Sequence, residues 1–271
     1  MLKLFFVSLV MLLCTSAHAF RLHSEHAILV SDDTGQVLLK KGGDAPVPIA
    51  SLTKLITAMV VLDSKPAMQE VIAIEAADVD SLKNSTSHVP VGAKLTRQDV
   101  LRLTLMSSDN RAAAALARTY PGGPQGFLAA AQAKLAVLGM TNTVIMEPSG
   151  LSPQNTSTVA DMAKAAQAAS HYPDIAGITT DRSEYVRMNG RNVLFHNTNR
   201  LVGARGWDIL LSKTGFTNEA GRCLVMRIKQ AGKSATLVLL NASGSASRAA
   251  DALAVRRILA GELSPKALST R

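Results

Sequence analysis

The stretch Ser51-Leu52-Thr53-Lys54, followed by the apolar run Leu55-Ile56-Thr57-Ala58-Met59-Val60-Val61-Leu62, decides how this chain folds. The run is long enough for a buried helix, and Ser51 and Lys54 fall in its first turn. Residues three apart share a helix face, so the hydroxyl and the amine can meet. Free N–H groups and the helix dipole at this end favour negative charge near the serine. A hydroxyl needs a base to become a nucleophile, and a lysine can serve if burial keeps its amine neutral.

Two further motifs follow in order, Ser108-Asp109-Asn110 and Lys213-Thr214-Gly215. Each of the three has an ordinary structural alternative: an N-cap serine with a solvated lysine, a cap between two helices, and a strand end before a turn. Any one motif alone would favour that alternative. The three in this order are the motif set of serine penicillin-binding proteins and class A β-lactamases, and the order favours the functional interpretation.

The start of the chain is typical of an exported protein. Met1-Leu2-Lys3 is a short positive segment, residues 4–13 are apolar, and Ala17-His18-Ala19 is a small-x-small cleavage site. We therefore predict a signal peptide over residues 1–19, too short for a conventional membrane span, and periplasmic localisation. Its removal takes Cys14 away, so Cys223 has no partner for an intramolecular disulfide, and its apolar context predicts a buried strand position.

A formal net charge of +9 narrows the partners that we expect. Scattered basic residues, few aromatic residues and export argue against nucleic acid, so we expect no nucleic-acid partner. Anionic cell-wall polymer or a negative membrane surface fits better, and a merely soluble basic protein is the plain alternative. The six histidines show no metal spacing, so we expect no metal and no other cofactor. No second long apolar run follows, so we expect no membrane span in the mature chain.

Hydrophobic periodicity and turn residues divide the mature chain into strands, a helical middle and strands again. A hairpin is expected over 26–39, a helix from Ser51 to about Pro66, and a short strand over 71–74. Further helices are expected at about 99–106 (capped by Thr96), 111–120, 127–138 and 159–169 (capped by Ser157). Strands are expected at 193–195, 209–214, 222–229 and 235–241, and a closing helix at 246–259.

This order of elements predicts an α+β fold, with a central antiparallel sheet covered by helices and an all-helical lobe beside it. We expect one domain over residues 20–271. Its α/β lobe would comprise about 20–75 and 185–271, and its helical lobe about 76–184.

The chain resembles the D-alanyl-D-alanine peptidases of the low-molecular-mass penicillin-binding proteins, peptidase family S11, and most of all their D,D-endopeptidase branch. The similarity runs over nearly the whole mature chain and implies a β-lactamase/transpeptidase-like fold. It is carried by family-like segments at residues 48–55, 105–113, 138–143, 147–151, 197–201 and 213–217.

The resemblance implies a role for each motif residue. Ser51 would attack the carbonyl of the penultimate D-alanine and form an acyl-enzyme, while Lys54 takes its proton. Ser108 would relay a proton to the leaving amine, and Asn110 would hold the substrate amide. The backbone N–H groups of Ser51 and Phe216 would form the oxyanion hole.

The third motif is implied to lie on the strand beside Ser51. Lys213 would supply positive charge that attracts an acidic substrate group and helps to keep Lys54 neutral. Thr214 would offer its hydroxyl to a substrate carboxylate. Gly215 would let the substrate backbone lie along the strand as an added β-strand.

Two departures from the carboxypeptidase pattern favour the endopeptidase branch. Asp109 and Arg111 stand where carboxypeptidases usually have a small residue and an aspartate, and the chain ends soon after its closing helix, without room for the extra β-domain and amphipathic anchor of many carboxypeptidases. Arg111 could pair with an acid or line the cleft.

Glu147 lacks the Glu-x-x-Leu-Asn context of the deacylating glutamate of class A β-lactamases.

We therefore expect a serine D,D-endopeptidase that cuts the bond from D-alanine to the diamino acid in peptidoglycan stem peptides. β-Lactam antibiotics should act on it as covalent inhibitors. The nearest alternative is a D,D-carboxypeptidase that removes terminal D-alanine, followed by a serine β-lactamase. A non-catalytic murein-binding protein that kept the fold is the last alternative.

Overall fold

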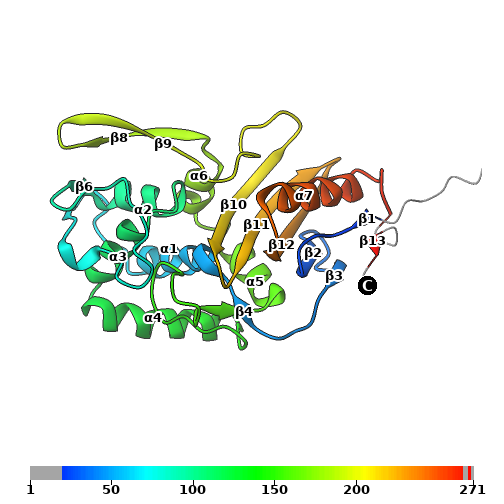
Figure 1. Ribbon diagram of the computed structural model, residues 1–271, viewed down its shortest axis with the longest axis horizontal. Helices are drawn as coiled ribbons and strands as arrows, with labels where there is room; N and C mark the ends of the chain where they lie inside the picture. Colours follow the sequence, from blue (N-terminus) through cyan, green and yellow to red (C-terminus); the bar gives the residue numbers. More distant parts are fainter. Residues whose placement is uncertain (1–19, 265–267, 270–271) are drawn as a thin grey trace, which may run out of the picture.

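The computed structural model describes residues 20–264 and 268–269, so the predicted signal peptide lies outside the described residues. A five-stranded sheet with the order β10-β11-β12-β2-β3 forms one side of the molecule, and most helices gather on the other (Figure 1). All neighbouring strands of this sheet are antiparallel. Its strands are β2 (His26–Ser31), β3 (Val37–Lys41), β10 (Asp208–Thr217), β11 (Gly221–Gln230) and β12 (Lys233–Ala242).

Helices cover both faces of this sheet, which explains why its strands read as long apolar runs. Leu237 and Leu239 of β12 belong to one core with α7 (Ser245–Leu259), while Val238 and Leu240 belong to a larger core with α1 (Thr53–Asp63) and α5 (Val159–Ala169). Successive side chains of a strand point to opposite faces, so the two cores alternate along β12. Figure 1 shows α7 lying across β11 and β12.

The helix α1 (Thr53–Asp63) has neighbours on all sides. Every residue from 53 to 61 is buried, as expected for a helix that is mostly apolar all round. It packs against α5, which lies on the sheet, and against further helices on its other sides. The remaining helices are α2 (Arg97–Leu105), α3 (Asn110–Arg118), α4 (Gly123–Val137) and α6 (Pro173–Thr180), with short 3₁₀ turns η1 (Ala50–Leu52) and η2 (Ala76–Asp78).

Four small two-stranded pairs complete the described fold. The longest is the β8–β9 hairpin, which Figure 1 shows as a ribbon along the upper edge of the molecule, beside α2. The pairs are β1 (Phe20–Arg21) with β13 (Leu268–Ser269), β4 (Val47–Pro48) with β7 (Thr156–Ser157), β5 (Val71–Ala73) with β6 (Lys94–Thr96), and β8 (Ser183–Met188) with β9 (Arg191–His196).

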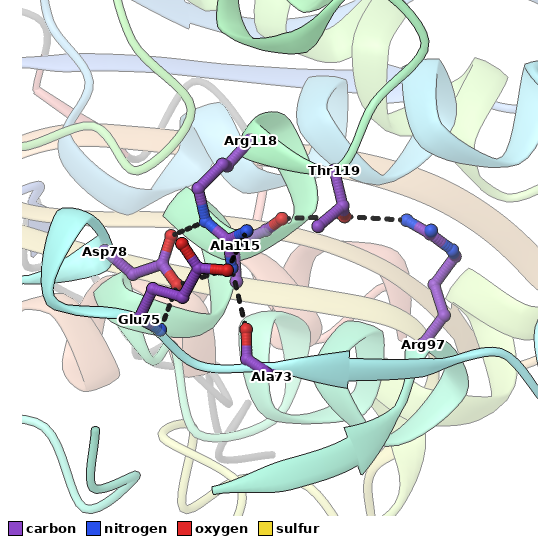
Figure 2. Close-up of polar contacts among 7 residues, drawn as sticks. All are labelled: Ala73, Glu75, Asp78, Arg97, Ala115, Arg118 and Thr119. Atoms are coloured by element: carbon purple, nitrogen blue, oxygen red, sulfur yellow. Dashed lines mark hydrogen bonds and ion pairs between the residues drawn. The ribbon is translucent and has the colours of Figure 1, made fainter. Parts of the chain in front are cut away.

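An arginine at the end of α3 ties the segment after β5 to the helical lobe (Figure 2). Arg118 donates to both carboxylate oxygens of Asp78, at 2.8 and 2.9 Å, to Glu75 at 2.9 Å, and to the Ala73 carbonyl at 2.7 Å. The Asp78 carboxylate is almost fully buried, so this cluster replaces the hydration that the carboxylate has lost. Its hydrogen bonds hold the segment against α3.

The structure confirms the predicted α+β class, with an antiparallel sheet and helices on its faces. Three local predictions need correction. α4 begins at Gly123, because Pro124 in its first turn lacks only an N–H that has no helical partner anyway. Thr158, not Ser157, caps α5 by accepting from the Asp161 N–H, while Ser157 belongs to β7.

The third correction concerns residues 173–180, where α6 forms although the sequence reasoning placed no helix. In addition, α5 falls in the range expected for the helical lobe, yet it packs on β11, β12 and β2. The boundary between the lobes is therefore not a single cut in the sequence. Within residues 20–264 and 268–269, no helix combines the length and apolar character needed to cross a bilayer.

Candidate active site

Ser51 lies in the 3₁₀ turn η1, two residues before α1 begins. Two glycines let backbone from elsewhere approach this turn closely. A β-carbon at Gly150 would lie 1.9 Å from the Ala50 carbonyl oxygen, and one at Gly215 would lie 3.1 Å from the Ser51 nitrogen. The serine is therefore held between the turn at residue 150 and the strand β10.

Lys54 is fully buried and directs its amine at three oxygen acceptors. Its Nζ donates to Ser51 Oγ at 2.9 Å, to Asn110 Oδ1 at 2.7 Å and to the Ser149 carbonyl at 2.6 Å. An ammonium group has three N–H donors, so this arrangement satisfies the protonated form completely. Loss of one proton leaves a lone pair that can accept the Ser51 hydroxyl proton.

Burial lowers the pKa of Lys54 from 10.5 to about 8, against the opposing effect of Glu147 and Asp109, which raise it. Burial, followed by the charges of Lys54 and Arg248, also places the pKa of Lys213 well below its usual value. Burial is the largest cause of both pKa shifts. Repulsion between the two amines is mutual, so it disfavours the state in which Lys54 and Lys213 are both charged.

The three motif residues at the junction of α2 and α3, Ser108, Asp109 and Asn110, have different roles. Asp109 is the N-cap of α3: it accepts from the Ala112 N–H at 2.9 Å, and it also accepts from the Ser87 hydroxyl at 2.7 Å. Ser108 has a positive φ of 60°, an uncommon conformation for a residue with a side chain. The structural interpretation of this motif therefore holds for Asp109, while Ser108 and Asn110 face the cleft of Ser51.

Asn110 connects the cleft to the loop between η2 and β6. Its Oδ1 accepts from Lys54, and its Nδ2 donates to Ser85 Oγ at 2.9 Å. Both ends of the amide are thus engaged, which fixes the orientation of this side chain.

The third motif lies on β10 at the opposite wall. Lys213 Nζ donates to Ser108 Oγ and to the Thr214 carbonyl, both at 2.8 Å. The Thr214 hydroxyl donates to Thr198 Oγ1 at 2.7 Å. Phe216 is 48% exposed, and the Arg222 guanidinium lies 3.7 Å from the centre of its ring.

The structure thus brings the three distant motifs together around one cleft of about 730 Å³. Ser51, Ser108, Asn110, Thr214 and Phe216 are among its lining residues, and hydrogen bonds attach Lys54 and Lys213 to them. Further residues at the cleft that the motifs did not identify are Thr198, Arg200, Arg222 and Arg248.

The turn at 147–150 supplies contacts that sequence reasoning missed. The Ser149 carbonyl accepts from Lys54, and the Glu147 carboxylate accepts from the Ser149 N–H and hydroxyl and from the Gly150 N–H. The sequence identifies this segment only as family-like, without a role, because a backbone carbonyl leaves no residue-type signal. Arg111, whose role the sequence left open, donates to the Val89 carbonyl.

The chain is similar to known proteins in both sequence and fold. A family model described as D-alanyl-D-alanine carboxypeptidase matches residues 14–244. A D-alanyl-D-alanine endopeptidase of Pseudomonas aeruginosa is 45% identical over 240 residues, covering 88% of this chain and 77% of the relative. One of Escherichia coli is 41% identical over 244 residues, covering 89% and 79%. The crystal structure of the Streptomyces K15 DD-transpeptidase superimposes with a TM-score of 0.80 at 26% identity, over 86% of this chain and 95% of that one.

Proposed function

The chain belongs to the S11 family of D-alanyl-D-alanine carboxypeptidases, and from this premise we propose that it is a periplasmic serine D,D-endopeptidase of peptidoglycan. The observation that carries the mechanism is the contact of 2.9 Å between the buried Lys54 amine and the Ser51 hydroxyl. With a pKa of about 8, about a tenth of this amine is neutral at pH 7. Ser51 is the nucleophile and Lys54 its base.

Acylation begins when neutral Lys54 accepts the Ser51 proton and Ser51 Oγ bonds to the carbonyl carbon of D-alanine. Backbone N–H groups of Ser51 and Phe216 stabilise the oxyanion, and the close approach of Gly215 to the Ser51 nitrogen supports that pairing. The C–N bond then breaks, and Ser108, hydrogen-bonded to Lys213, gives its proton to the leaving amine. Ser108 in turn takes up the proton that Lys54 had accepted from Ser51, so Lys54 is neutral again when the acyl-enzyme has formed.

Deacylation regenerates the enzyme. Water adds to the acyl carbon while Lys54 takes its proton, the bond to Ser51 Oγ breaks, and the proton returns to Ser51. The buried amine serves as base in both halves of the reaction, and no cofactor is needed for this balance of atoms and charge.

The substrate is a peptidoglycan stem peptide that lies along β10. Asn110 and the Thr214 hydroxyl hold its amide and carboxylate groups, and Gly215 leaves room for its backbone. β-Lactams enter the same cleft and acylate Ser51, because their strained amide takes the place of the scissile peptide bond. The export signal expected over residues 1–19 brings the enzyme to this substrate in the periplasm.

Two alternatives use the same nucleophile. Removal of terminal D-alanine is supported by the description of the family model, whereas both relatives above 40% identity are named endopeptidases. A class A type of β-lactamase needs a glutamate free to activate water. Here the Glu147 carboxylate is occupied by three donors of its own turn, which argues against that alternative.

Mass spectrometry after brief exposure to benzylpenicillin tests the nucleophile. We expect one stable adduct on Ser51 and none on the Ser51→Ala variant; rapid return to the unmodified mass would indicate a β-lactamase.

Digestion of purified sacculi then separates the endopeptidase from the carboxypeptidase. Loss of cross-linked dimers supports the endopeptidase, and loss of terminal D-alanine alone would overturn it.

A further inference from the structure

A second groove lies along the β8–β9 hairpin, next to the cleft of Ser51. Its volume is about 790 Å³, which is in the range of pockets that hold drug-sized or peptide ligands. The hairpin forms most of its lining through Met188, Val193 and Phe195, and the segment at His88 and Pro90 lines it too. The function proposed above does not use this groove.

The two grooves share a wall made of two backbone segments. In the first segment, Ser107 lines the second groove and Ser108 lines the cleft. In the second, His196 lines the second groove and Thr198 lines the cleft. The Thr198 N–H donates to the Met106 carbonyl at 3.1 Å and joins the segments. Because neighbouring Cα atoms are about 3.8 Å apart, the linings of the two grooves lie one residue apart at Ser107 and Ser108.

This wall lies on the leaving-group side of the proposed reaction. Ser108 donates a proton to the leaving amine, and the Thr214 hydroxyl contacts Thr198 at 2.7 Å. A carboxypeptidase releases a single D-alanine there. An endopeptidase must hold a whole second stem peptide on this side, and that peptide carries free carboxylates.

The charge of the second groove is complementary to such a peptide. His88, Arg191 and His196 line it, and no aspartate or glutamate is among its lining residues. All three side chains are exposed, so they are accessible to a ligand. Guanidinium and imidazole N–H groups are good donors to carboxylates. The apolar part of the lining suits the aliphatic stem of a diamino acid.

We propose that the second groove binds the leaving stem peptide of a cross-linked substrate, with Arg191 and His196 donating to its carboxylates. The inference rests on the proposed endopeptidase function and adds a specificity site to it. The ligand class is an acidic peptide. These residues lie outside the cleft of Ser51, so they select cross-linked substrate without taking part in the chemistry.

Charge reversal of Arg191 tests the groove. We expect Arg191→Glu to lower kcat/KM for a cross-linked muropeptide dimer by about tenfold or more, mainly through KM, since a hydrogen bond to a charged group is lost. Release of D-alanine from a monomeric pentapeptide and acylation by benzylpenicillin should stay unchanged. Arg187→Glu is the matched control, because Arg187 is an exposed arginine of the same hairpin that does not line this groove.

A second substrate, a muropeptide dimer whose leaving stem has amidated carboxylates, tests whether Arg191 acts on those carboxylates. It allows the change in the enzyme and the change in the substrate to be made separately and together. Wild type should hydrolyse it about tenfold more slowly than the free acid, and Arg191→Glu should cause no further loss. If Arg191→Glu and wild type hydrolyse the dimer equally well, the proposed role of the groove is wrong while the endopeptidase function stands. The proposed role is also wrong if Arg191→Glu lowers kcat/KM equally for the amidated and the free dimers. Wild type that cleaves no dimer would overturn the endopeptidase itself.

Discussion

Lys54 sets the pH dependence of the proposed chemistry. Only the neutral amine can take the Ser51 proton, and burial lowers its pKa to about 8. The rate of acylation by benzylpenicillin should therefore rise as pH increases towards about 8 and level off above it. Second-order acylation constants from about pH 6 to about pH 10, with circular dichroism at each pH as the control for folding, measure this. A rate that is flat across the range would exclude Lys54 as the titrating base.

Removing the charge of Asp109 should shift the pH dependence of acylation without altering Ser51 itself. Its charge raises the pKa of Lys54, so Asp109→Asn should shift the rising limb of the acylation rate to lower pH. Asparagine is as good an N-cap as aspartate, so α3 should keep its stability. Asp99→Asn, in the first turn of α2, is the control and should leave the profile where it is, because Asp99 is not among the groups that shift the pKa of Lys54. A profile that moves to higher pH in Asp109→Asn would contradict the assigned cause.

Gly150 is needed for the contact that holds the turn of Ser51. Alanine there would place a β-carbon 1.9 Å from the Ala50 carbonyl oxygen at a φ of +83°. We expect Gly150→Ala to lower the free energy of unfolding by about 3 kcal/mol and to slow benzylpenicillin acylation strongly. Gly139→Ala is the matched control: its φ is +62° but nothing lies within 4 Å of the new carbon, so only about 1 kcal/mol should be lost. Equal effects of the two variants would show that backbone strain alone matters.

At the scale of elements, the link between α3 and the segment after β5 depends on Arg118. Arg118→Met would leave the Asp78 carboxylate buried without its charge partner, and we expect a loss of about 3 kcal/mol in unfolding free energy by denaturant titration. Arg257→Met is the control, because its ion pair with Glu262 is exposed at 3.4 Å and should be worth less than about 1 kcal/mol. Benzylpenicillin acylation of the folded Arg118→Met protein should persist, and its loss would place the cluster closer to the chemistry than the structure indicates.

The sequence predicts elements well where one physical signal dominates. The apolar run of α1 and the strands β10 to β12 could be located because burial on all sides leaves long hydrophobic stretches. The start of α4 was missed because Gly122 and Pro124 read as a break, although proline fits a first turn. α6 was missed because its eight residues include Pro173 and Gly177, which usually mark turns or helix ends.

At the scale of the molecule, resemblance to a known motif set carried the prediction that distant segments converge. Periodicity could place Ser51 and Lys54 together, since they are three residues apart, but not Asn110 or Lys213. Spacing also gives no hint of the Ser149 carbonyl, which accepts from Lys54 at 2.6 Å. Burial could be named from the sequence as the condition for a neutral Lys54, but its extent could not, since desolvation depends on the complete fold.

The charge of the whole chain should govern its attachment to the cell wall. A formal net charge of +9 attracts the protein to anionic peptidoglycan, and salt screens this attraction, since the Debye length falls from about 10 Å at 0.1 M to about 3 Å at 1 M. Co-sedimentation of the Ser51→Ala variant with purified sacculi should therefore drop sharply between about 0.05 M and about 0.5 M NaCl. Wild type blocked by benzylpenicillin should behave the same, because scattered surface charge rather than the cleft provides this binding. Sedimentation that is insensitive to salt, or that penicillin abolishes, would assign attachment to the cleft instead.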